Sequence, residues 1–112
     1  MRPPLLPAAL LLTMALLPGC ARRAGCEALL TNHSAIAVEQ LYLAPAATRQ
    51  WSPDLLRGGG LSSQASMPLR FPAEGAYTLR IVWVDGRAAE LPGVAACEAR
   101  RINILGQGLR AE

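Results

Sequence analysis

Short apolar runs alternate with clusters of turn residues through most of this chain. Six runs have the length and composition of β-strands, and they cover residues 27–31, 36–43, 65–71, 77–84, 87–91 and 99–105. The run 36–43 also allows a helical pattern, but Val38 and Tyr42 favour a strand and Pro45 ends the run. The pattern therefore predicts an all-β chain of about six strands.

The segment 77–84, YTLRIVWV, is the strongest strand of the chain, and its pattern places Trp83 in the core. Asp85-Gly86 follows at once and precedes another apolar run. This dipeptide predicts a β-hairpin with a type I′ turn, which needs positive φ at both positions. Pro68 lacks a backbone N–H, so the strand that contains it is expected at a sheet edge.

Six short strands without long helices predict a small antiparallel β-sandwich, a single domain over residues 27–105. One short helical turn is expected at 52–56, because Ser52 can cap a helix and Pro53 suits its first position. Residues 106–112 are expected to form a flexible tail.

The first 19 residues have the pattern of a secretion signal. Arg2 supplies the positive end, and residues 5–17 form the apolar core. A membrane span needs roughly 20 apolar residues, so this run is too short to be one. Residues 1–19 are therefore expected to be removed from the mature protein.

The sequence Leu17-Pro18-Gly19-Cys20 is similar to a bacterial lipoprotein cleavage site, with Pro18 as a departure. The resemblance implies that the Cys20 thiol carries a diacylglycerol, that its freed amine is acylated, and that the bilayer is a partner. Ala21, which is not Asp, resembles sorting to the outer membrane rather than retention at the inner membrane. The alternative is an ordinary signal peptide that leaves Cys20 as a plain residue.

Residues 20–26 form a short tether after the signal. Arg22 and Arg23 would lie beside the headgroups, where each charge contributes about 1 kcal/mol on an anionic surface. A solvated spacer is the competing interpretation.

Cys26 and Cys97 are left if Cys20 is acylated. An exported domain lies in an oxidising compartment, so the two cysteines are expected to form a disulfide. It would close a loop of about 72 residues, for which chain entropy gives at most about 4.4 kcal/mol of stabilisation. A redox or metal-binding thiol is the alternative, but there is no C-x-x-C motif.

Composition narrows the function classes. The chain has 11 arginines and no lysine, and its 8 acidic residues offset most of this charge and leave a net charge of +3, so no nucleic-acid partner is expected. At 52% hydrophobic residues, it is too apolar for a disordered chain.

The catalytic inventory is thin. His33 is the only histidine, and Asp54, Asp85 and Glu90 are scattered without a suggestive spacing. A metal site built on His33, Met67 and a thiol has no support in the spacing. The sequence therefore predicts a protein that is not an enzyme, with no cofactor and no metal.

Trp51 and Asp54 are candidate contacts for a partner protein. Tryptophan is enriched at binding hot spots, and Trp51 lies in a polar loop. The competing interpretation is that Trp51 folds back to cover one end of the small sandwich.

The chain resembles a family of small exported proteobacterial proteins of unknown function over about residues 28–105. The resemblance is carried by Asn32, Leu41-Tyr42-x-x-Pro45, Trp51-x-x-Asp54-Leu55-Leu56, Tyr77-x-Leu79-Arg80-Ile81-Val82, Asp85-Gly86-Arg87 and Cys97-Glu98. It implies a compact β-sandwich without known cofactors. Relatives often carry a cysteine where this chain has Ala76, so Cys26 would have to replace the usual partner of Cys97.

These observations together predict a lipid-anchored periplasmic lipoprotein of the outer membrane. Its expected role is a non-enzymatic protein-interaction or envelope structural module. A periplasmic domain that binds a small ligand or a metal is the alternative.

Overall fold

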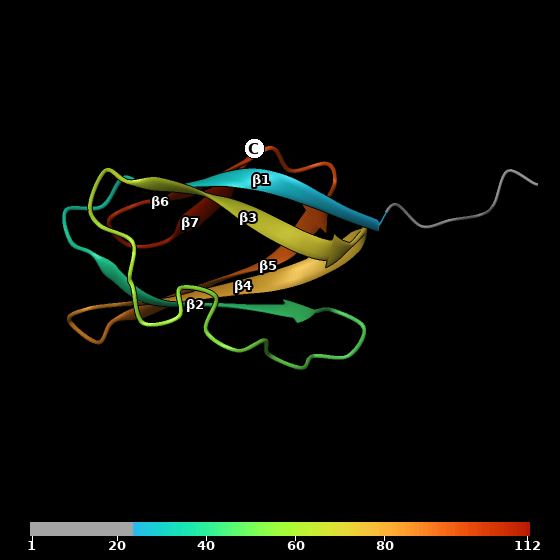
Figure 1. The fold of residues 1–112 in the computed structure, drawn as a ribbon, viewed down its shortest axis with the longest axis horizontal. Coiled ribbons are helices and arrows are strands. Elements are labelled where there is room, and N and C mark those ends of the chain that lie inside the picture. Colours follow the sequence, from blue (N-terminus) through green and yellow to red (C-terminus); the bar gives the residue numbers. More distant parts are fainter. Residues whose placement is uncertain (1–23) are drawn as a thin grey trace, which may run out of the picture.

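The computed structural model describes residues 24–112, which form a sandwich of two β-sheets (Figure 1). The strands are β1 (Ala24–Asn32), β2 (Val38–Pro45), β3 (Ser66–Ala73), β4 (Gly75–Trp83), β5 (Ala88–Ala96), β6 (Arg101–Ile104) and β7 (Leu109–Ala111). Sheet A has the order β3-β1-β6-β7, and sheet B has the order β2-β4-β5. The predicted all-β sandwich is confirmed. Within residues 24–112, no helix is long and apolar enough to cross a membrane.

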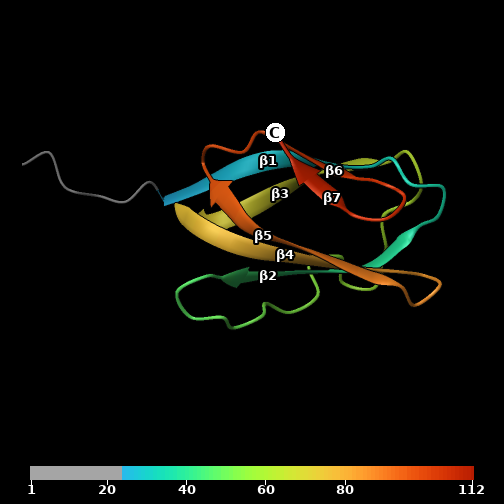
Figure 2. The same ribbon diagram turned by 180° about the vertical axis from the view of Figure 1, so that it is seen from behind.

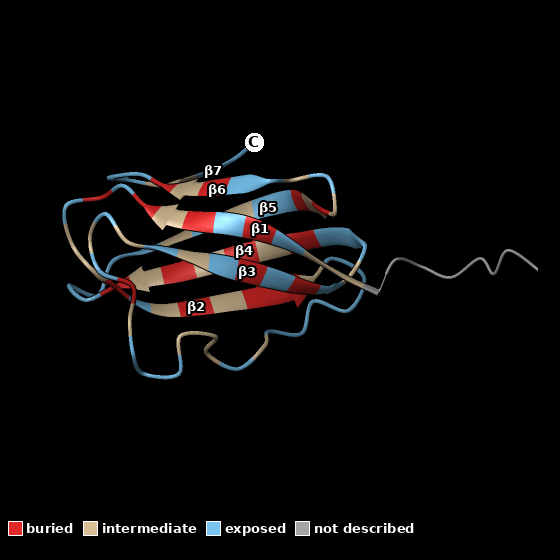
Figure 3. Cartoon of the chain, turned by 45° about the horizontal axis from the view of Figure 1, so that its top comes forward, coloured by how far each residue is buried: buried red, intermediate tan, exposed pale blue. Residues whose placement is uncertain are grey.

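The core lies between the two sheets, and buried residues alternate with less buried ones along β4 and β6 (Figure 3). Sheet B contributes Tyr77, Leu79 and Ile81 from β4, and sheet A contributes Phe71 and Ile102. Trp83 is only 1% exposed, so its predicted place in the core is confirmed.

Two features of sheet A differ from the expected antiparallel sandwich. β1 and β6 are parallel, with Leu30 opposite Ile102. These strands are far apart in the chain, so no tight turn imposes an antiparallel direction on them. The expected flexible tail instead contains β7, which pairs antiparallel with β6 at the edge of sheet A (Figure 2). β7 is held by backbone hydrogen bonds to β6. A strand of three residues is too short to show an apolar pattern, so the sequence did not predict it.

β1 also begins earlier than predicted. Ala24 pairs with Ala73, so the last residues of the expected tether 20–26 belong to the sheet. Residues 1–23, with the expected signal peptide, Cys20 and Arg22, lie outside the described residues.

The predicted hairpin between β4 and β5 is present, but its turn is not type I′. Gly86 has a φ of 91°, whereas Asp85 is not among the residues with positive φ. The N–H of Trp83 donates to the Arg87 carbonyl at 2.8 Å, which closes a three-residue loop. This loop is the common three-residue hairpin loop that ends in a left-handed residue. It needs positive φ at one position only, which Gly86 supplies.

Pro68 lies on β3 at the edge of sheet A, as predicted. The N–H of Leu29, the partner of Pro68, donates toward β6, to the Arg100 carbonyl. The backbone nitrogen of Pro68 therefore points to the outer edge of the sheet. Pro72, four residues further along β3, points to the same edge. Because proline cannot donate, the outer edge of β3 is a poor template for another strand.

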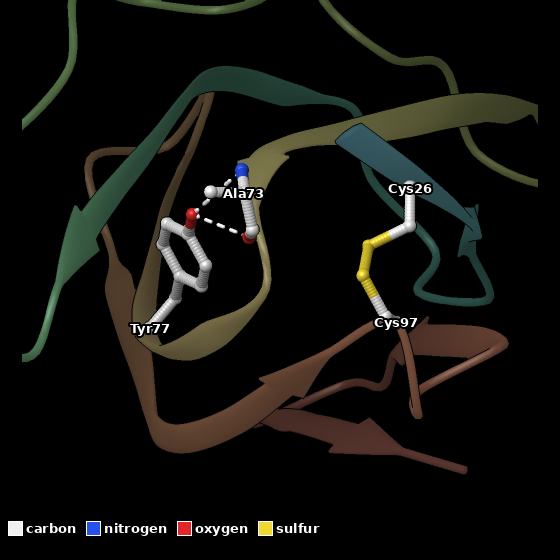
Figure 4. The surroundings of a disulfide bond; sticks show 4 residues. All are labelled: Cys26, Ala73, Tyr77 and Cys97. Atoms are coloured by element: carbon white, nitrogen blue, oxygen red, sulfur yellow. Dashed lines mark hydrogen bonds between the residues drawn. A yellow bond between two sulfur atoms is a disulfide. The ribbon is translucent and has the colours of Figure 1, made fainter. Parts of the chain in front are cut away.

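A disulfide joins Cys26 of β1 to Cys97, which follows β5 (Figure 4). Their Cα atoms are 5.2 Å apart, within the usual range, and the bond ties sheet A to the end of sheet B. Cys97 has a φ of 71°, a backbone conformation that favours glycine. Beside it, the Tyr77 hydroxyl donates to the Ala73 carbonyl at 2.8 Å and accepts from the Ala73 N–H at 3.2 Å (Figure 4). These contacts fix the corner where the chain passes from β3 to β4.

Asn32 organises the opposite end of the sandwich and is fully buried. Its Nδ2 donates to the carbonyls of Ile36 at 2.9 Å and Leu61 at 3.1 Å, and its Oδ1 accepts from the Ser34 N–H at 3.0 Å. The Trp83 indole N–H donates to the Ser34 hydroxyl at 3.0 Å. Within the described residues, every buried side-chain nitrogen and oxygen has a partner.

Candidate functional site

The segment between β2 and β3 runs back along the free edge of β2 (Figure 1). The N–H of Ser52 donates to the Leu43 carbonyl at 2.7 Å, and the Ser52 Oγ accepts from the Leu43 N–H at 3.0 Å. Asp54 Oδ1 accepts from the Leu41 N–H at 3.1 Å. Two side chains thus satisfy donors that an edge strand would leave exposed, which protects β2 from pairing with another chain.

These bonds explain why residues 52–56 do not form the predicted helical turn. The Ser52 N–H and side chain are engaged by β2, so Ser52 does not cap a helix. Asp54 Oδ1 also accepts from the Leu56 N–H at 2.9 Å, and Arg57 has a φ of 50°. Serine and aspartate side chains compete with helical hydrogen bonding in this way. The segment forms a hydrogen-bonded turn instead.

Trp51 immediately precedes this clamped segment and is 45% exposed. This exposure argues against the interpretation that Trp51 folds back to cover one end of the sandwich. Trp51 lines two open hollows, of about 440 and 330 Å³, together with outward-facing residues of sheet B. Trp51 therefore stands on the outer face of sheet B.

The surface around the indole, which we call the Trp51 face, combines aromatic and polar groups. It consists of Gln40, Tyr42, Arg49, Trp51, Arg80 and Glu90. Arg80 and Glu90 form a half-exposed ion pair at 2.8 Å, and the Tyr42 hydroxyl donates to Gln40 Oε1 at 2.9 Å. Arg49 has a φ of 56°, and its N–H donates to the Pro45 carbonyl at 2.8 Å. Backbone held in this sparsely populated region often marks a functional segment.

Asp54, the second predicted contact, lies against the edge of β2. Its carboxylate accepts the two backbone hydrogen bonds to Leu41 and Leu56 described above. Asp54 therefore positions the segment that carries Trp51. Gln40, Tyr42 and Arg80 were missed as site residues, although their alternation with buried positions on β2 and β4 was visible in the sequence.

The candidate catalytic residues are not brought together. His33 lies on the loop after β1, where Nε2 is 3.2 Å from Asn103 Oδ1, and Asp85 lies in the hairpin after β4. Hydrogen bonds from the Arg87 side chain and N–H lower the pKa of Asp85. Within residues 24–112, no three or more His, Cys, Asp or Glu side chains lie close enough to hold a metal ion.

A hollow of about 810 Å³ lies at the end of the sandwich where β1 begins. Small apolar residues such as Ala46, Ala47 and Ala76 line most of it, with Glu74 and Glu98 as its acidic groups. Tyr77 also lines the hollow, and its hydroxyl is hydrogen-bonded to the backbone of Ala73. This hollow has the size of a ligand site but few polar groups that could orient a ligand.

No family model, curated protein or solved structure matched this chain. The family resemblance described above therefore stays a prediction. The fold is that of a small all-β sandwich with one disulfide in the part that the structure describes.

Proposed function

We propose that this protein is an outer-membrane lipoprotein, anchored through Cys20, whose periplasmic domain binds another envelope protein through the Trp51 face. The carrying observation is Trp51 itself, a large aromatic side chain that is 45% exposed and directly precedes Ser52, which is hydrogen-bonded to Leu43 of β2. A rigidly held aromatic loses little conformational entropy on binding, and tryptophan is enriched among residues that dominate interface energies.

Two features favour a protein partner over a small ligand and over catalysis. The hollows beside Trp51 are open and shallow, and the larger end hollow has few groups to orient a ligand. His33, Asp54 and Asp85 lie on three different loops and do not form a catalytic arrangement. The free edge of β2 is already covered, so we expect the partner to contact side chains of sheet B rather than to add a strand.

The test is chemical crosslinking of the tagged full-length protein in intact cells. We expect a discrete adduct in the wild type and its loss in Trp51→Ala. Val84→Ala is the matched control, because Val84 is 56% exposed on the hairpin after β4, outside the Trp51 face. An adduct that survives in Trp51→Ala, or no adduct in any version, would contradict the proposal.

A further inference from the structure

The outer face of sheet A has a composition unlike that of the Trp51 face. Leu29 lies at its centre and is 46% exposed, with Pro68 opposite it on β3 and Arg101 opposite it on β6. Arg70 and Arg110 lie on the same face, since their partners in the sheet, Glu27 and Asn103, alternate with buried residues.

This face carries more arginine than acidic side chains, in a part of the chain whose side-chain charges sum to zero. Three of the 11 arginines, Arg2, Arg22 and Arg23, precede the described residues. The other 8 arginines balance the 8 acidic residues. On the face of sheet A, three arginines stand against Glu27 and Glu112. Within residues 24–112, neither Arg101 nor Arg110 forms an ion pair.

The place where β1 begins limits how far this face can be from a bilayer. Three residues separate Cys20 from Ala24, and the four Cα-to-Cα steps between them reach at most about 14 Å when fully extended. β1 is an interior strand of sheet A, so the chain enters the domain within that sheet. An acylated Cys20 would therefore hold sheet A close to the headgroups, where the surface potential still acts.

Charge then distinguishes between two orientations. If the domain stood on its end, the exposed carboxylates of Glu74 and Glu98 would meet the anionic headgroups. If it lay on sheet A, Arg101 and Arg110 would meet them, and Leu29 could enter the interface. We propose that the outer face of sheet A is a docking surface for an anionic lipid bilayer. The proposal rests on the proposed lipid anchor, and it leaves the Trp51 face pointing toward the periplasm.

The test uses the purified full-length protein with its anchor, reconstituted into vesicles of phosphatidylcholine alone or mixed with phosphatidylglycerol. Phenylglyoxal modifies exposed arginines, and mass spectrometry reads each site. We expect modification of Arg101 and Arg110 to slow about fivefold for each in the anionic vesicles. Arg49 and Arg57, on the segment beside sheet B, should react at unchanged rates.

Leu29→Glu should abolish this protection, because it places a carboxylate among the arginines. Val84→Glu is the matched control and should keep the protection, since both positions are exposed and outside the core. A protein whose intact mass lacks acyl chains and that does not float with vesicles would overturn the anchor itself. An acylated protein in which Arg101 reacts as fast in anionic as in neutral vesicles would overturn only the docking surface. Protection that requires added envelope proteins would also overturn it, in favour of an acidic protein partner.

Discussion

Asn32→Ala gives the sharpest test of how the distal end of the sandwich is held together. The substitution removes the hydrogen bonds that Asn32 donates to the carbonyls of Ile36 and Leu61 and those that it accepts from the N–H and the hydroxyl of Ser34. Both carbonyls keep another donor, namely the Ser34 hydroxyl and the N–H of Val38. The Ser34 N–H is left buried without its partner.

The magnitude follows from this count. Each of the two hydrogen bonds to a carbonyl that keeps another donor contributes about 1 kcal/mol. The Ser34 N–H, buried without an acceptor, costs about 1–3 kcal/mol. Asn32→Ala should therefore lower the free energy of unfolding by about 3–5 kcal/mol. Small domains have about 5–15 kcal/mol in total, so the variant should be close to unfolding.

The assay is equilibrium urea unfolding of the oxidised protein, followed by circular dichroism. The midpoint should fall while the slope m stays constant, since the unfolded chain is the same size. Asn103→Ala is the matched control. Its side chain bonds His33 and Glu112 at exposed sites, so we expect a loss below about 1 kcal/mol. Equal losses in the two variants would refute the reasoning.

Asn32→Asp separates loss of the donor from loss of side-chain volume. A carboxylate at this position would face the carbonyl oxygens of Ile36 and Leu61 in a fully buried site. Burial penalises the ionised form, so the folded-state pKa of the new carboxyl should lie above its unfolded value. The variant should be most stable below about pH 4 and lose stability as the pH rises. A pH-independent loss would show that the donor is not the deciding group.

Three further predictions concern the disulfide, its left-handed cysteine and the hairpin carboxylate. Replacing both Cys26 and Cys97 by serine should lower the free energy of unfolding by up to about 4.4 kcal/mol, measured by urea unfolding, and an unchanged midpoint would contradict a structural role for the bond. In a Cys26→Ala background, Cys97→Gly should be about 1 kcal/mol more stable than Cys97→Ala, because the φ of 71° favours glycine; equal midpoints in thermal unfolding would argue against this backbone conformation. The pKa of Asp85, measured by NMR titration of its carboxyl carbon, should lie below its ordinary value and rise part of the way back in Arg87→Ala, which loses the side-chain bond but keeps the backbone N–H bond. Because the folded-state pKa is lowered, the stabilisation from Asp85 is present above the unfolded pKa and lost as the pH falls through the folded one; an identical titration in both proteins would contradict this.

The sequence predicted the class of the fold and several local features of it. The alternation in residues 77–84 identified β4 and buried Trp83, because a strand between two layers must be apolar on one side. Pro68 marked an edge strand because it lacks a donor. The two cysteines of the domain were expected to pair, and they do.

Other features depended on contacts between residues far apart in the chain. The parallel pairing of β1 with β6 and the strand β7 arise from backbone hydrogen bonds, which carry no side-chain signal. The two hydrogen bonds that Asp54 Oδ1 accepts, from the N–H groups of Leu41 and Leu56, were likewise not visible in the sequence. The helical turn expected at 52–56 does not form, because the polar groups of Ser52 and Asp54 are hydrogen-bonded to the backbone of β2.

The sequence by itself determined the two-layer all-β architecture and the buried position of Trp83. These follow from local periodicity and from the burial of apolar side chains, which each strand encodes independently. The tertiary structure alone decided which surfaces are left for binding. The arrangement of the two sheets leaves Trp51 exposed over sheet B. It also places Leu29, Arg101 and Arg110 together on the outer face of sheet A. A shared outer face depends on strand order and register, which no single segment specifies.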